Sequence, residues 1–143
     1  MISFTDEQLA FIQSQRVGRL ATADRQGQPH VIPVCYACDG RSIYIALDAK
    51  PKRVAPQQLR RVRNLLENPR IALVVDRYSD DWSVLAYVLI RGSAELLGGG
   101  DEQLHAVGLL RDRYVQYQTM PIQEQPIIAI RPSAITSWGA LSS

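Results

Sequence analysis

The sequence has little of the side-chain chemistry on which most enzyme classes depend. Its 143 residues include only two cysteines and two histidines, and neither a G-x-S-x-G nor an H-E-x-x-H motif occurs. The glycine-rich phosphate loops G-x-G-x-x-G and G-x-x-x-x-G-K-[ST] are also absent. These absences argue against a serine hydrolase of the elbow type, an H-E-x-x-H zinc protease and a doubly wound nucleotide-binding fold.

Long apolar runs and a large net charge are missing as well. No run approaches the roughly 18 to 20 residues that cross a bilayer, and 16 basic against 14 acidic residues leave a formal charge of +2. A dedicated nucleic-acid-binding protein usually carries a broad basic face. The chain opens with acidic residues in place of a secretory signal. We therefore expect a cytoplasmic protein of one domain over residues 1–143, without a nucleic-acid or membrane partner.

The two cysteines, Cys35 and Cys38, are spaced like a metal or redox pair. They lie in a segment with the pattern of a strand, where residues i and i+3 point to opposite faces. No second pair of cysteines or histidines completes four zinc ligands. We expect two strand cysteines and no metal site.

Local patterns predict three helices and six strands. Thr5 and Gln8 form a capping box that begins a helix ending near residue 15. A second helix is expected from Pro56 to a stop at Asn68-Pro69, and a third over 101–117. The strands are expected at 17–23, 28–38, 42–47, 70–78, 84–97 and 126–138. Strands that mostly follow one another, without a βαβ alternation, predict a mainly β (α+β) fold with a closed or nearly closed antiparallel barrel.

The clearest electrostatic feature is a basic stretch over residues 50–70, with seven basic residues against one acid. It begins at a strand end and runs into the start of the second helix, where free N–H groups and the helix dipole favour anions. Arginine can also hold phosphate oxygens in a bidentate manner. The pattern favours a phosphate site over a solvated basic helix face. The candidate contacts are Lys50, Lys52, Arg53, Arg60 and Arg61.

No pair of side chains forms an obvious acid–base dyad. A phosphate site without such a dyad is typical of coenzyme chemistry, in which the protein binds and orients the reactive group.

The order of several segments resembles the pyridoxamine 5'-phosphate oxidase-like split-barrel superfamily, and in particular its deazaflavin (coenzyme F420)-dependent branch. The resemblance covers nearly the whole chain and is carried by segments 17–23, 27–34, 43–53, 59–73 and 75–82. The stretch 59–73 is the most specific, and 75–82 is similar to the deazaflavin branch. The end of the chain departs from the full-length oxidases, so the resemblance does not extend to their vitamin substrate.

The resemblance implies a six-stranded antiparallel split β-barrel that binds its coenzyme between the two subunits of a homodimer. It implies phosphate contacts at Lys52, Arg60, Arg61 and Asn64, and largely backbone contacts to the ring. The segments expected beside the ring include Pro33, Val34, Ile45 and Ala46. Trp82 and Trp138 are large amphipathic residues suited to the interface, although each could equally cap its own barrel.

The sequence therefore predicts an oxidoreductase that transfers a hydride between F420 and a small unsaturated or imine-like organic substrate. One alternative is an FMN-dependent oxidase or reductase on the same fold. Another is a non-catalytic carrier of a flavin or haem. No residue is assigned a catalytic proton transfer.

Overall fold

The computed structural model describes residues 2–47 and 59–142 of the 143-residue chain. Its helices are α1 (Asp6–Ser14), α2 (Arg60–Glu67) and α3 (Asp101–Arg113), with short 3₁₀ turns η2 (Trp82–Val84), η3 (Val115–Gln118) and η4 (Ile122–Glu124). Its strands are β1 (Gly18–Ala23), β2 (Pro29–Val34), β3 (Ala37–Cys38), β4 (Ile43–Ala46), β5 (Arg70–Arg77), β6 (Ala86–Leu97) and β7 (Ile127–Gly139). The expected fold class, mainly β with short flanking helices, is confirmed.

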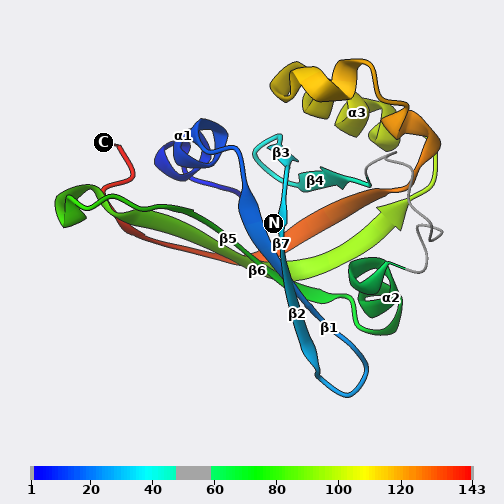
Figure 1. Cartoon of the computed structure of the whole chain (residues 1–143), viewed down its shortest axis with the longest axis horizontal. Coiled ribbons are helices and arrows are strands. Elements are labelled where there is room, and N and C mark those ends of the chain that lie inside the picture. Colours follow the sequence, from blue (N-terminus) through cyan, green and yellow to red (C-terminus); the bar gives the residue numbers. More distant parts are fainter. Residues whose placement is uncertain (1, 48–58, 143) are drawn as a thin grey trace.

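All described strands belong to one antiparallel sheet with the order β2-β1-β5-β6-β7-β4-β3. The sheet is strongly curled, and the long strands β5, β6 and β7 cross its centre (Figure 1). Strands β2 and β3 form the two outer edges of the sheet, although only Cys35 and Tyr36 separate them in the chain. The two edges therefore come together at one point, and the sheet forms a half-barrel with a seam there.

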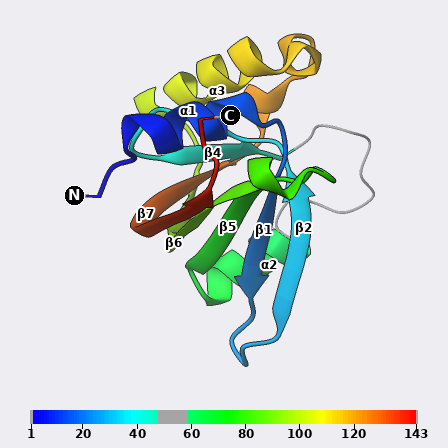
Figure 2. The same cartoon turned by 90° about the vertical axis from the view of Figure 1, so that its left-hand side faces the viewer.

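Two hydrophobic clusters hold the layers together. The larger cluster fills the inside of the curl with residues such as Leu20, Leu73 and Ile90, together with apolar residues of α1 and α2. The smaller cluster packs α3 against the other face of β4 and β7. Figure 2 shows α1 and α3 on one side of the molecule, with the β1–β2 hairpin extending away from them. Strand β4 is therefore buried on both faces.

The expectation of six strands is wrong by one, because the predicted strand 28–38 is divided into β2 and β3. Tyr36 causes the division. Its side chain is fully buried, and its hydroxyl lies within hydrogen-bond distance of two carbonyls, of Ile12 at 2.6 Å and of Gln15 at 3.0 Å. Its backbone N–H donates to the Tyr114 hydroxyl at 3.0 Å. The last bond occupies the backbone N–H that a continuous strand would offer to a sheet neighbour, and the side-chain contacts hold Tyr36 out of the strand.

Two helix ends also differ from the expectation or cannot be compared with it. The third helix ends at Arg113, not at Tyr117, because Tyr114 has extended backbone angles and η3 follows it. The Tyr114 ring is buried and its hydroxyl donates to the carbonyl of either Arg16, at 2.8 Å, or Tyr36, at 2.9 Å, so tertiary contacts override helical periodicity. The expected helix start at Pro56 lies outside the described residues.

Candidate active site

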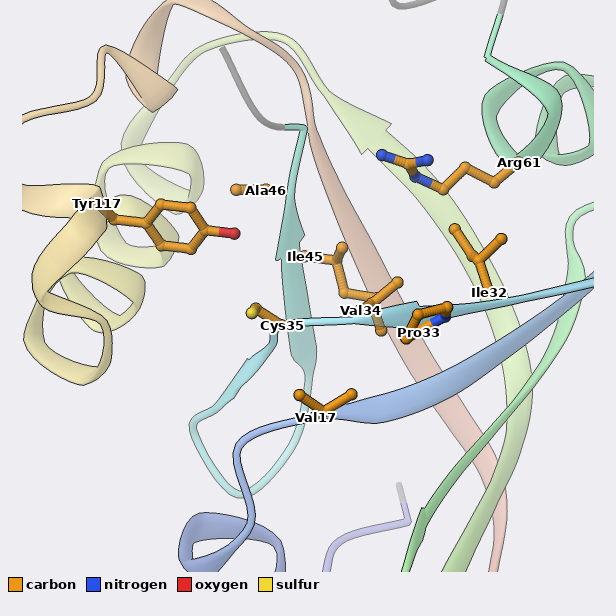
Figure 3. Close-up of a pocket in the computed structure, with 9 residues that line it drawn as sticks. All are labelled: Val17, Ile32, Pro33, Val34, Cys35, Ile45, Ala46, Arg61 and Tyr117. Carbon is orange, nitrogen blue, oxygen red and sulfur yellow. The ribbon is translucent and has the colours of Figure 1, made fainter. Parts of the chain in front are cut away.

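A cavity of about 330 Å³ opens at the seam, where β2 and β4 both end. We call it the seam cavity. Its lining residues come from five separate parts of the chain and are drawn in Figure 3. They are Val17, Ile32, Pro33, Val34, Cys35, Ile45, Ala46, Arg61 and Tyr117. Among these described lining residues Arg61 is the one that carries a formal charge.

The strand geometry determines the apolar walls. Strand β4 is buried along its length, with Ile45 in the larger cluster and Ala46 in the smaller one. Strand β2 pairs with β1 on one side only, so alternate backbone N–H and C=O groups on its other side have no partner strand among the described residues. Pro33 contributes no N–H to that edge. The cavity thus combines apolar side chains with backbone polar groups of an edge strand.

Arg61 and Tyr117 approach the seam cavity from opposite sides. Arg61 projects from α2 with its guanidinium directed toward the cavity, and the Tyr117 hydroxyl points inward from η3 (Figure 3). Tyr117 is buried and its ring meets that of Tyr114 edge-on, with centroids 5.5 Å apart. A cation therefore faces a phenol across an apolar slot.

The other predicted phosphate contacts are distributed differently. Arg60 and Asn64 line a smaller cavity of about 260 Å³ beside the β1–β2 hairpin, together with His30. Asn64 is almost fully buried and donates to the Thr22 hydroxyl at 3.0 Å, while its Oδ1 has no hydrogen-bond partner among the described residues. The consecutive residues Arg60 and Arg61 therefore serve two neighbouring cavities. Lys50, Lys52 and Arg53 lie outside the described residues.

The two tryptophans lie away from the seam cavity. Trp82 belongs to η2 and is 72% exposed, whereas Trp138 is 54% exposed and stacks on Tyr87 with ring centroids 5.9 Å apart. Neither residue lines the seam cavity. Both lie on the surface of the chain.

A second cavity of about 600 Å³ adjoins the first and shares Val17, Cys35 and Tyr117 with it. We call it the tyrosine cavity. Its remaining lining residues are Arg16, Arg113, Tyr114, Val115, Gln116 and Met120. The sequence did not predict Tyr117 or Cys35 as cavity residues. Tyr117 lay in a continuous helical pattern and Cys35 in a continuous strand pattern, and neither pattern indicated the break that places the residue at the cavity.

The two cysteines occupy different environments. The expectation that both lie in a strand is wrong for Cys35, which lies in the break between β2 and β3, and only Cys38 belongs to a strand. Cys38 packs in the larger cluster, whereas Cys35 is half-buried beside the smaller one. Burial raises the pKa of the Cys38 thiol to about 12, so this side chain stays protonated and unreactive at neutral pH. No group of three or more histidine, cysteine or acidic side chains suited to a metal occurs within residues 2–47 and 59–142.

A polar network fastens α3 to the sheet near the smaller cluster. Arg131 on β7 donates from Nη2 to the Glu102 carboxylate at 2.8 Å, and the Tyr44 hydroxyl donates to the same carboxylate at 2.7 Å. Hydrogen bonds from Arg131 and then from Tyr44 lower the pKa of Glu102 to about 2. Burial, followed by the bond to Glu102, raises the pKa of Tyr44 to about 12. The network positions α3, from whose end the chain continues through Tyr114 into η3.

The fold and its seam define a class: a small half-barrel with an apolar cavity, open at the sheet edge and bordered by one arginine. The family model for pyridoxamine 5'-phosphate oxidase matches residues 4–139. The chain belongs to this family. No helix within the described residues is both long enough and apolar enough to cross a membrane.

Three similar proteins illustrate the range of this fold. A 5a,11a-dehydrotetracycline/5a,11a-dehydrooxytetracycline reductase of Streptomyces rimosus is 29% identical over 139 residues, covering 95% of this chain and 83% of the reductase. A haem-binding protein from Mycobacterium smegmatis aligns with a TM-score of 0.75 and 21% identity, over 100% of this chain and 57% of its own. A protein described as an F420 reductase aligns with a TM-score of 0.69 and 23% identity, over 93% and 98%.

Proposed function

We propose that this protein is an oxidoreductase that binds a flavin-type coenzyme in the seam cavity and transfers a hydride between it and a small organic substrate. The observation that carries the proposal is the seam cavity itself, an apolar slot with one cation in a chain of the pyridoxamine 5'-phosphate oxidase family. The Streptomyces rimosus relative, whose name describes a reductase, supports the redox class.

The walls of the seam cavity fit a flat heterocyclic ring. Pro33, Val34, Ile45 and Ala46 offer apolar surface to its faces, and the edge of β2 offers backbone groups to its ring nitrogens and oxygens. Pockets of this kind, mostly apolar with a few placed polar groups, are typical of coenzyme sites. These residues would hold the ring and exclude water from it.

The basic residues fit the anionic part of such a coenzyme. Arg61 reaches the seam cavity from α2, and Arg60 and Asn64 border the neighbouring cavity one helical turn away. The sequence adds Lys50, Lys52 and Arg53 immediately before α2. Arg61 thus brings a positive charge to the slot, whereas the cavity of Arg60 and Asn64 also includes the acidic Asp24. We propose that the coenzyme phosphate binds at the Arg61 end of the slot.

The coenzyme, when bound, supplies the hydride, and a solvent proton completes the reduction of an unsaturated or imine-like substrate. Among the described residues the seam cavity carries no acidic or histidine side chain. We therefore assign its residues to binding and orientation, and assign none to proton transfer.

We favour F420 as the coenzyme and keep FMN as the alternative. The strand-loop 75–82 resembles the deazaflavin branch, and a protein described as an F420 reductase shares the fold. The haem-binding neighbour makes a non-catalytic haem carrier the competing function. Histidine, cysteine thiolate and tyrosine can each serve as an axial ligand to haem iron. The described lining of the seam cavity has no histidine but includes Cys35 and Tyr117, so the choice between coenzyme and haem rests on the titrations below.

Parallel titrations of the purified protein with F420, FMN and haemin test this proposal. We expect F420 fluorescence to report binding of one F420 molecule per chain. In a second assay, we expect the protein to oxidise reduced F420 when an acceptor is added. FMN binding with no F420 binding would support the alternative. Tight binding of haemin alone would replace the oxidoreductase by a carrier.

We further propose that two copies pair through the face of the sheet opposite the larger cluster. Ala21, Ala72, Val74 and Leu89 lie on that face, are half-buried and belong to neither cluster. Trp138 and its stacking partner continue the same face toward the end of β7. Arg19, Asp76 and Arg91 lie on the same face, so it mixes apolar and charged groups, as many subunit interfaces do. That the partner would complete the coenzyme site is what the family resemblance implies.

A charge placed on this face tests the dimer. We expect Leu89→Glu to convert the protein to monomer in sedimentation velocity, while Leu104→Glu, on exposed α3, leaves the dimer intact. Coenzyme affinity of the native protein should fall on dilution below the dimer dissociation constant, because the site separates with the interface. A native monomer that binds coenzyme at full affinity would contradict the shared site.

A further inference from the structure

The tyrosine cavity lies directly beside the seam cavity. Val17, Cys35 and Tyr117 line both cavities, so molecules bound in the two would be close together. The tyrosine cavity is larger, at about 600 Å³, a volume within the range of small-molecule sites. A ring in the seam cavity and a second organic molecule here would be neighbours.

The wall formed by residues 115–120 is held rigidly, although it contains no regular helix beyond η3. Arg111 on α3 donates to the carbonyls of Tyr117 and Met120, each at 3.0 Å, and to the Gln123 side chain at 2.6 Å. One guanidinium thereby fixes two points of the segment and ties it to η4. A cavity wall that is fixed before binding loses less entropy when a ligand arrives.

Two tyrosine rings give the tyrosine cavity an aromatic surface. The Tyr114 hydroxyl is already used: it accepts from the Tyr36 N–H and lies within hydrogen-bond distance of the carbonyls of Arg16 and Tyr36. The Tyr114 ring in turn lies against the Arg113 and Arg16 guanidinium groups, at 5.2 and 5.8 Å from its centroid, so Tyr114 holds both cations at the cavity. The edge-on ring of Tyr117 and the flexible side chain of Met120 extend this surface. Such a lining favours a flat, conjugated molecule.

The charges of the tyrosine cavity are of one sign. Arg16 and Arg113 line it, and no acidic residue does so among the described residues. The Nη atoms of Arg113 donate to the carbonyls of Gln13 and Gln15 and to a tyrosine hydroxyl, so Arg113 is largely structural. Arg16 is exposed and, within residues 2–47 and 59–142, donates only from Nη1, to the Arg113 carbonyl. Arg16 keeps donors for a ligand.

We infer that the tyrosine cavity is the substrate subsite, and that it selects flat, conjugated organic anions whose negative group is bound by Arg16. The assignment as a substrate subsite rests on the proposed function, because a neighbouring coenzyme is what gives the second molecule a reaction partner. The preference for a conjugated anion rests only on the aromatic and cationic lining.

Two dyes with the same ring system separate these contributions. 1-Anilinonaphthalene-8-sulfonate is a conjugated anion, and N-phenyl-1-naphthylamine is its uncharged parent. We expect both to bind the protein in a one-to-one ratio, with the sulfonate bound more tightly. A charge-assisted hydrogen bond contributes about 1.5–3 kcal/mol, so Arg16→Gln should weaken the sulfonate at least about tenfold and leave the uncharged dye unchanged.

Arg25→Gln is the matched control, because Arg25 lies in the exposed β1–β2 turn. This substitution also removes one positive charge, but away from the tyrosine cavity. Val115→Glu is a second test that spares the fold, since Val115 is 68% exposed at the cavity rim. We expect it to weaken the sulfonate selectively, as Arg16→Gln does. Equal weakening by Arg25→Gln, or unchanged sulfonate binding in both cavity variants, would overturn the inference. Loss of both dyes in Arg16→Gln would overturn the role of charge.

A final measurement joins the dye site to the reaction. In protein saturated with the coenzyme identified by titration, we expect the sulfonate still to bind and to inhibit reduction competitively with the acceptor. Displacement of the sulfonate by coenzyme would show that the cavities form one site and would overturn the substrate assignment. A protein that binds the dyes as expected but no coenzyme would instead refute the proposed function.

Discussion

The hydroxyl of Tyr36 fastens the seam, and Tyr36→Phe removes it without changing the ring. The hydroxyl is fully buried and lies 2.6 Å from the Ile12 carbonyl and 3.0 Å from the Gln15 carbonyl. Loss of a buried hydrogen-bonding group that leaves its partners unsatisfied costs about 1–3 kcal/mol. We expect a loss near the middle of that range, about 2 kcal/mol, because the Gln15 N–H also donates to the Ile12 carbonyl and compensates in part.

A loss of about 2 kcal/mol corresponds to a fall in Tm of roughly 8 °C for a chain of this length. The assay is thermal unfolding followed by circular dichroism, with urea unfolding as a second measure. Tyr78→Phe is the control, because Tyr78 is 69% exposed and its hydroxyl makes only a long contact of 3.4 Å. A Tm for Tyr36→Phe within about 1 °C of the native protein would refute the idea that this hydroxyl holds the seam.

Three further changes have definite expected outcomes. A Cβ at Gly92 would lie 2.1 Å from the Arg131 carbonyl oxygen, so Gly92→Ala should destabilise the fold by about 1–3 kcal/mol or more in urea unfolding; native stability would show that the strands can separate freely. The pKa of Glu102 is lowered from 4.5 to about 2, so the ionised carboxylate stabilises the fold above pH 4.5 and this stabilisation is lost as the pH falls toward 2. Glu102→Gln should therefore lower the free energy of unfolding by about 1 kcal/mol at pH 7, a small value because the ion pair is partly exposed. At pH 2 the substitution should have no effect. The double variant Cys35→Ser/Cys38→Ser should retain coenzyme binding, and the native protein should contain no stoichiometric zinc by elemental analysis; one equivalent of metal, absent from the variant, would overturn this.

Much of the local structure could be predicted from the sequence because its causes are local. The capping box of Thr5 and Gln8 is present with both hydrogen bonds, at 3.1 and 3.0 Å. Asn68 ends α2 as its position before a proline predicted. In each case the interacting groups lie within a few residues of one another.

The breaks in the chain could not be predicted in this way, because distant residues cause them. Tyr36 leaves the strand pattern to bond with residues 21 and 24 positions earlier and with Tyr114, 78 positions later. The same contacts end α3 early and move Tyr117 into the seam cavity. No local sequence pattern indicates partners so far apart. The sequence therefore did not predict Tyr117 as a residue of the seam cavity.

The candidate site was predicted in part. Pro33, Val34, Ile45, Ala46 and Arg61 were named from a family resemblance, and the structure brings all five into one cavity. Trp82 and Trp138 were named from residue type, and in a single subunit they lie elsewhere on the surface. The coenzyme contacts themselves stay predictions, as does the dimer interface that would bring a partner's surface to the site.

The central claim is that the seam cavity binds the coenzyme and that Arg61 supplies its cation. The direct test compares the coenzyme dissociation constants of Arg61→Gln and Arg63→Gln, measured by fluorescence titration. Both variants lose one positive charge from α2, but Arg61 is directed toward the seam cavity and Arg63 is exposed outside it. We predict a weakening of about tenfold or more for Arg61→Gln and little change for Arg63→Gln. Equal dissociation constants for the two variants would contradict the account.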